Sequence, residues 1–145
     1  MENFDFNKVI YASDKHRFSF YECCNIHLDT GRELDSEVVS VLYLIALVES
    51  VQGEIRHRAY DFQERLIKPE CLKEPWQTSG TLKALRLAYN LWDGFVEEEK
   101  EVYSTPYEMF DNYWAPYFVQ AIKLRFKSSF EPLPGFCKTV YGIKR

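Results

Sequence analysis

A short run of small polar residues stands at the start of a predicted helix, in the stretch WQTSGTLKALR at residues 76–86. The first backbone N–H groups of a helix have no partner within the helix, and the helix dipole favours negative charge beside them. Such a helix start can bind a phosphate or another anion. The candidate residues for a nucleotide-like ligand are Trp76, Thr78, Ser79, Gly80, Thr81, Lys83 and Arg86.

These residues could contact different parts of a nucleotide-like ligand. Trp76 offers a flat face to a base or a sugar, and Lys83 and Arg86 follow the helix start on one face of the helix. A plain structural interpretation stays open, because Ser and Thr are common N-caps and a basic stripe is typical of a solvated helix face. The run lacks the first glycine and the length of a P-loop.

A second group of candidates is aromatic and acidic. The segment 103–118, YSTPYEMFDNYWAPYF, is crowded with aromatic residues, and the acidic run VEEEKE precedes it. Tyr and Trp are enriched at protein interfaces, and acidic side chains can mimic nucleic-acid phosphates toward a basic groove. The alternative is that the rings fill a corner between two short helices while the charges are solvated. The candidate partner surface comprises Tyr103, Tyr107, Tyr113, Trp114, Tyr117, Glu97, Glu98 and Glu99.

The sequence contains no recognisable catalytic or metal-binding motif. The three histidines are scattered, and the four cysteines have no CxxC spacing. We therefore expect no cofactor, no metal and free thiols packed as small hydrophobic side chains. Catalytic activity stays open but has no positive support. The residues concerned are His16, His27, His57, Cys23, Cys24, Cys71 and Cys137.

Length and composition bound the class of protein. A chain of 145 residues with 46% hydrophobic and 28% charged residues predicts one globular domain over 1–145. The net charge of −4 disfavours direct binding to nucleic acid. The N-terminus lacks a signal-peptide pattern, and the apolar stretch 38–48 is too short to span a bilayer. We expect a cytoplasmic protein without a membrane segment.

Hydrophobic periodicity predicts an all-α, compact bundle of about five to six helices. Its centre should be a helix over 36–50, capped by Asp35, because this stretch is apolar nearly all round. A further helix is expected over 79–93, ended by Gly94, and another should begin at Pro116. The tail after 130 leaves a short strand or an extended arm open.

Two other helices are predicted before residue 70. Ser13 should cap the first, in which Phe18, Tyr21, Cys24 and Leu28 recur at helical spacing. The second should cover 52–67. We expect its charged residues to form ion pairs on an exposed face, and these residues are Arg56, Arg58, Asp61 and Glu64.

Four phrases of the sequence carry a resemblance over roughly residues 40–126: LYLIALVES, YDFQERLIKPECL, WQTSGTLKALRLAYNLWDG and YWAPYFVQAIKLRF. Together they resemble an uncharacterised family of small proteins from Gram-positive bacteria, their phages and other mobile elements. The resemblance implies no activity, cofactor or catalytic residue. It implies a context in which small accessory proteins act by binding and often block host defence.

Three functions follow as hypotheses. The first is a non-enzymatic accessory protein that binds a host defence protein stoichiometrically through the aromatic and acidic surface. The second is a small-molecule binder that sequesters a nucleotide-like signal at the helix start. The third is an enzyme that acts on such a ligand. Oligomeric state cannot be read from the sequence.

Overall fold

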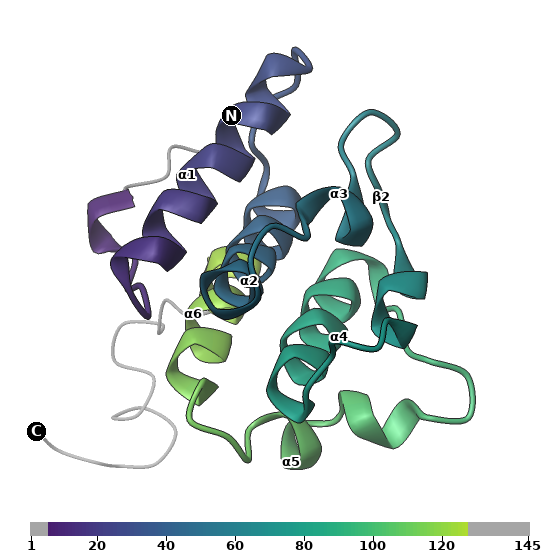
Figure 1. Cartoon of the computed structure of the whole chain (residues 1–145). Helices are drawn as coiled ribbons and strands as arrows, with labels where there is room; N and C mark the ends of the chain where they lie inside the picture. Colours follow the sequence, from purple (N-terminus) through teal and green to yellow (C-terminus); the bar gives the residue numbers. More distant parts are fainter. Residues whose placement is uncertain (1–5, 128–145) are drawn as a thin grey trace, which may run out of the picture.

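The computed structural model describes residues 6–127 of the chain. In this part the chain forms six α-helices, one small antiparallel sheet and short 3-10 turns (Figure 1). The mostly α-helical class predicted from the sequence is confirmed. The helices are α1 (Asp14–Asp29), α2 (Ser36–Gln52), α3 (Arg56–Ala59), α4 (Ser79–Asp93), α5 (Pro106–Met109) and α6 (Ala115–Arg125). The other elements are η1 (Phe6–Lys8), β1 (Tyr60–Asp61), β2 (Leu66–Ile67), η2 (Pro69–Lys73) and η3 (Glu101–Ser104).

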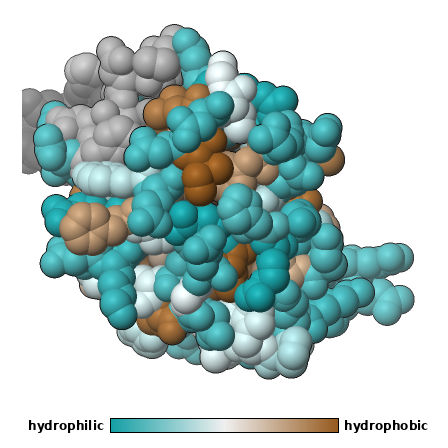
Figure 2. All heavy atoms as spheres, turned by 45° about the horizontal axis from the view of Figure 1, so that its top comes forward, coloured by the Kyte–Doolittle hydropathy of each residue, from teal (hydrophilic) through white to brown (hydrophobic). Residues whose placement is uncertain are grey.

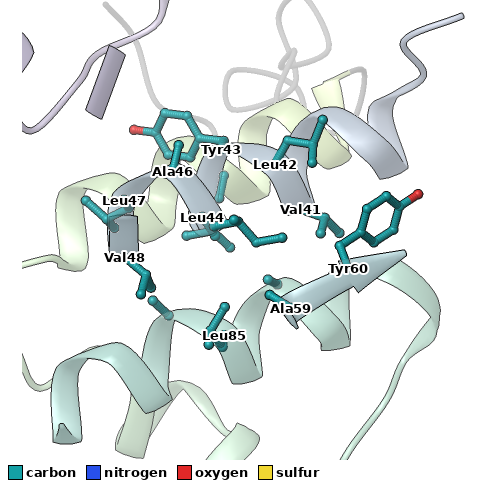
Figure 3. Close-up of a cluster of buried hydrophobic side chains, with 14 of the residues drawn as sticks. Val41, Leu42, Tyr43, Leu44, Ala46, Leu47, Val48, Ala59, Tyr60 and Leu85 are labelled. Atoms are coloured by element: carbon teal, nitrogen blue, oxygen red, sulfur yellow. The ribbon is translucent and has the colours of Figure 1, made fainter. Parts of the chain in front are cut away.

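Helix α2 is the centre of the fold, as its apolar sequence predicts. Every residue from Val38 to Glu49 is buried, and α1, α4 and α6 pack around the helix. Figure 3 shows α2 side chains meeting Leu85 of α4 and the segment around Ala59. The N-cap is also as predicted, because the Asp35 carboxylate accepts the Val38 N–H at 2.9 Å.

Helix α4 has the bounds that its sequence predicts. Thr78 and Thr81 form a reciprocal capping box at its start, in which each side chain accepts the other residue's N–H. Gly94 ends the helix with a φ of +82°, in the left-handed region that glycine adopts without strain. The buried face of α4 includes Ala84, Leu85 and Ala88.

Helix α1 begins after its N-cap Ser13, as predicted, but buries a different face from the one its apolar pattern indicates. The side chains turned to the core are those of His16, Ser19, Phe20, Cys23, Cys24 and His27. Phe18 and Leu28 are 58% and 45% exposed. Only Cys24 of the predicted stripe is fully buried, so the inward face is a mixture of polar and hydrophobic side chains that differs from the predicted stripe.

The predicted helix over 52–67 is wrong. Helix α3 lasts four residues, and a hairpin follows in which Tyr60 pairs with Ile67. The Asp61 carboxylate accepts the N–H groups of Gln63 and Glu64, each at 3.0 Å, and thereby fixes a turn where a helix would have continued. Arg65 closes the loop with a φ of +55°.

A buried tyrosine of α4 forms hydrogen bonds with both ends of the hairpin. The Tyr89 hydroxyl donates to the carbonyls of Ala59 and Lys68, at 2.9 and 3.1 Å, which stand on either side of the hairpin's base. This hairpin lies in the middle of the chain. The strand or arm predicted for the C-terminal tail, and Cys137, fall outside the described residues.

Within residues 6–127, no helix combines the length and apolar character needed to cross a bilayer. The three cysteines of this part are free and buried, as the sequence predicts.

Two glycines at the ends of α4 provide a matched test of this local geometry. Gly94→Ala should lower the free energy of unfolding by about 1 kcal/mol, because a Cβ is strained at its positive φ. Gly80→Ala should be neutral or stabilising by about 0.5 kcal/mol, because its Cβ would meet Thr78 and Trp114 at an ordinary 3.9 Å. Urea unfolding of both variants measures the difference, and equal effects would contradict it.

Candidate functional site

The start of α4 uses its own side chains to satisfy its N–H groups. The Thr81 N–H donates to the Thr78 hydroxyl at 3.2 Å, and the Thr78 N–H donates to the Thr81 hydroxyl at 2.8 Å. Thr81 is buried and also donates to the Gln77 side chain at 2.6 Å. Ser79 is exposed and Gly80 lies partly beneath the Trp114 ring. The plain cap predicted as the alternative is therefore present.

The two cations of the predicted anion site bind protein groups. Arg86 Nε lies 2.5 Å from a carboxylate oxygen of Glu97, and both side chains are largely buried. The Arg86 guanidinium also lies over the Tyr103 ring, 4.9 Å from its centroid. Lys83 donates to the carbonyl of Asp111 at 3.2 Å. Both cations thus attach the segment 95–114 to α4.

Trp76 is half-buried and belongs to a small polar group. Its Nε1–H donates to the Glu74 carboxylate at 3.1 Å, and Arg58 lies 5.9 Å from its ring centroid. Arg58 is also ion-paired with Glu74 at 3.1 Å. The seven residues predicted for a nucleotide-like ligand therefore do not converge: the cap residues bind one another, and Trp76, Lys83 and Arg86 have separate partners.

The aromatic segment 103–118 contains both exposed rings, as expected of an interface, and buried rings that fill the core. Tyr107 and Tyr113 are 88% and 82% exposed, and Tyr103 is 43% exposed. Trp114 is buried against Gly80, so its prediction as a partner-surface residue is wrong. Tyr117 is half-buried and packs against the core. We use the name tyrosine surface for the exposed set, which consists of Tyr103, Tyr107, Tyr113, Glu98 and Glu99.

Acidic residues surround these tyrosines. Glu98 and Glu99 are exposed as predicted, whereas Glu97 is turned inward to Arg86 and is not available to a partner. Residues 93–111 contain seven acidic residues and one lysine, a net charge of −6 in a chain whose total is −4. The negative charge of the protein is therefore concentrated on this segment.

The face in Figure 2, which brings the top of Figure 1 forward, has a different character. Its surface is largely hydrophilic, and hydrophobic residues gather there only in small, separate patches. Scattered apolar side chains of this kind are ordinary for a protein surface.

A buried charge cluster, missed in the sequence, lies at the C-terminal end of α2. The Glu49 carboxylate accepts N–H groups from Ile55 and Arg56 at 2.8 and 2.9 Å, and the Arg56 side chain at 2.8 and 3.1 Å. It also accepts the Ser19 hydroxyl of α1. Arg56 NH2 in turn donates to Glu22 at 3.0 Å. The predicted exposed ion-pair face that included Arg56 is wrong, because Arg56 is buried.

One feature of the sequence could have indicated this cluster, because Glu49 is a lone carboxylate at the end of an apolar helix. Burial alone would raise the pKa of Glu49, but hydrogen bonds from Arg56, Ser19 and the Ile55 N–H outweigh burial and lower it. Burial and the Glu49 charge raise the pKa of the Cys23 thiol well above its ordinary value. Glu49 is held as a satisfied anion and Cys23 as an unreactive thiol, so the cluster suits structure better than nucleophilic chemistry.

Both histidines of α1 are buried and serve the fold. The Ala12 N–H donates to His16 Nδ1 at 3.0 Å, so the proton is on Nε2, which donates to the Tyr43 carbonyl at 2.9 Å. Burial lowers the pKa of His16 to about 4. Burial also lowers the pKa of His27, whose Nε2 pairs with the Glu33 carbonyl at 2.9 Å. Within residues 6–127, no three His, Cys, Asp or Glu side chains are grouped to hold a metal ion.

Comparison with known families gives one match. A family of unknown function, DUF6075, matches residues 6–134. The chain belongs to this family. Membership of an uncharacterised family is what the resemblance in the sequence predicts. No curated protein and no solved structure matches the chain.

The Glu49–Arg56 pair predicts an unequal effect of two neighbouring arginines. Arg56→Ala should lower the free energy of unfolding by about 3 to 5 kcal/mol, because it leaves the Glu49 carboxylate buried without its main partner. Arg58→Ala is the matched control and should cost less than about 1 kcal/mol, since its ion pair with Glu74 is partly exposed. Chemical denaturation compares them, and a loss at Arg56 no larger than at Arg58 would refute the assignment.

The neutral state of His16 predicts a pH effect. As pH falls from 6.5 to about 4, the unfolded chain gains a proton at this histidine that the folded chain does not bind. Stability that is fully present above pH 6.5 is lost across this window, by about 3 kcal/mol for this residue. His16→Gln should therefore show a shallower decline between these pH values than the wild type. A slope in His16→Gln equal to that of the wild type would contradict the prediction.

Proposed function

We propose that this chain is a non-enzymatic accessory protein that acts by stoichiometric binding of another protein through the tyrosine surface. The observation that carries the proposal is the exposure of Tyr107 and Tyr113, at 88% and 82%, since most of the other aromatic rings among the described residues are buried or partly buried. Tyrosine gives a large contact area with a polar end and little rotamer entropy to lose, and it is enriched among the residues that dominate interface energies.

The setting of these tyrosines supports the same proposal. Met109 and Trp114 are buried beneath the segment that carries them, and Arg86 and Lys83 tie the segment to α4. Ordering of this kind before binding reduces the entropy lost on association. The acidic side chains around the tyrosines favour a partner with a basic surface, because opposite potentials steer the encounter and raise the association rate.

The biological setting is the finer part of the proposal. The resemblance to small proteins of phages and mobile elements supports a role as an accessory protein, and the proposed partner is a host defence protein that the chain inhibits in the cytoplasm. A basic groove that normally holds nucleic acid is the kind of target surface that an acidic, tyrosine-rich surface could occupy.

Sequestration of a nucleotide-like ligand at the start of α4 has less support. Lys83 and Arg86, the cations that such a ligand would need, are engaged by Asp111 and Glu97. An enzyme that acts on the ligand has less support still, because the buried Glu49 and Cys23 are not poised for reaction.

The proposal predicts that two tyrosines dominate partner affinity. The tagged protein would be used to capture a partner from a defence-competent bacterial host, and the purified partner would be titrated by calorimetry. We expect a fixed stoichiometry, and Tyr107→Ala with Tyr113→Ala should weaken binding at least tenfold without changing the melting temperature. Leu66→Ala, at an exposed apolar site on the hairpin, is the control and should bind as the wild type does.

The same variants carry the biological test. Wild-type protein should restore phage growth on a host with the targeted defence, and the double tyrosine variant should not. Undiminished affinity in the double variant would remove the tyrosine surface from the proposal. A phosphate compound released from the denatured purified protein would instead support the ligand-binding alternative.

A further inference from the structure

Helix α1 carries two stripes on nearly opposite sides. His16, Phe20, Cys23 and His27 face the core. At 100° per residue, the second stripe lies about 150° around the helix axis from the first. It consists of Phe18, Tyr21, Asn25 and Leu28. The stripe predicted from the sequence has Cys24 in place of Asn25, and Cys24 is buried. Phe18, Asn25 and Leu28 are exposed, whereas Tyr21 is half-buried and packs its ring against Phe20 and Tyr11.

The outward stripe is open and bordered by two grooves. Phe18 and Leu28 are 58% and 45% exposed, and Asn25 is exposed between them. Phe18 and Val51 help to line a groove of about 420 Å³ beside the end of α2. Leu28 and Leu34 help to line an apolar groove of about 350 Å³ on the other side. An apolar stripe between two grooves has the shape that a second helix needs in order to interdigitate.

The spacing of the stripe identifies the kind of helix that fits. Its residues are separated by three, four and three positions, which is the a and d pattern of a coiled coil. We propose that a second copy of this chain occupies the stripe, with the two α1 helices parallel and related by a two-fold axis. Phe18 and Asn25 then take a positions, and a single polar Asn at an a position favours one register of such a pair.

Charge complementarity supports the parallel arrangement. In this register Arg17 is a g position and Glu22 is the e position that faces it from the other helix. Within the chain, the ion pair of Arg17 with Asp14 is long, at 3.4 Å. Glu22 uses Oε2 for Arg56, and its side chain is 65% exposed. Each pair of copies would gain two Arg17–Glu22 contacts.

Most of the molecule lies away from this pairing. His16, Phe20, Cys23 and His27 occupy c and f positions, so the globular body lies mainly on the far side of its own α1 from the partner. At the edge of the seam, Tyr11 contacts Tyr21, with the two ring centroids 6.2 Å apart. The tyrosine surface follows α4 and is separated from α1 by α2 in Figure 1. The dimer therefore goes beyond the proposed binding function, and either could fail without the other. A contact confined to a helix of 16 residues is small, so reversible, roughly micromolar association is expected.

Sedimentation equilibrium of the full chain, from about 1 μM to 1 mM, tests the proposal. We expect a concentration-dependent monomer–dimer equilibrium. Phe18→Ser with Leu28→Ser should weaken the dimer at least tenfold, and the exposed Leu66→Ser on the hairpin should leave it unchanged. All of these sites are solvent-exposed, so melting temperatures should stay close to that of the wild type.

A charge-swap experiment tests the arrangement itself. Arg17→Glu places two carboxylates opposite each other in the dimer, and Glu22→Arg places two guanidinium groups there, so each variant alone should dimerise at least tenfold more weakly than the wild type. Mixing the two variants restores opposite charges at both contacts and should produce a heterodimer. A mere folding defect would not be repaired by mixing.

Three results would overturn the proposal. The first is a protein that stays monomeric over the whole range, including the case in which residues 128–145 of the same chain cover the stripe. The second is a dimer that is indifferent to the Phe18 and Leu28 substitutions. The third is a mixture of the two charge variants that associates no better than either variant alone, which would exclude the parallel arrangement.

Discussion

The buried carboxylate of Glu49 determines how the first half of the chain is arranged. It is the one ionised group in the buried stretch of α2, and burial of an unpaired charge is strongly unfavourable. Two parts of the chain supply hydrogen bonds to this carboxylate. Ile55 and Arg56 donate from the segment that follows α2, and Ser19 donates from α1. Because desolvation offsets much of the attraction within a buried ion pair, the pair contributes more to defining geometry than to net stability.

This requirement explains why α1 buries polar side chains beside Phe20 and Cys23. Ser19 must reach Glu49, and His16 must reach the Tyr43 carbonyl, so both lie on the side that faces α2. The apolar residues Phe18 and Leu28 are then carried to the outside. Hydrogen bonds with specific geometry, together with the hydrophobic area of Phe20, Cys23 and Cys24, determine which face of α1 is buried.

The parts of the fold that the sequence predicts well are those controlled by neighbouring residues. Asp35, Thr78 and Gly94 end their helices by contacts within a few positions, and the apolar length of α2 places it in the core. The hairpin at Tyr60 and Ile67 was missed because it depends on Tyr89, which is distant in sequence and binds both of its sides. The burial of Arg56 was missed for the same reason.

The candidate site likewise has features that the sequence predicts and features that depend on residues distant in the chain. The exposure of Tyr107 and Tyr113 agrees with a composition typical of interfaces, whereas the burial of Trp114 depends on its contact with Gly80 of α4. The roles of Lys83 and Arg86 could not be predicted from helix periodicity, because periodicity gives the face of a helix and not what lies against it. Their partners, Asp111 and Glu97, are contributed by a segment with little regular structure.

In the segment 95–114, which is attached to α4, the residues that hold the fold together differ from those that are exposed on the surface. The side chains that fix the segment, such as Arg86, Met109 and Trp114, point inward, while Tyr107 and Tyr113 contribute little to the core. Substitutions at the outward positions can therefore accumulate without repacking α2. Under the proposed function, a change of a few surface residues would be enough to exchange one binding partner for another while the same scaffold persists.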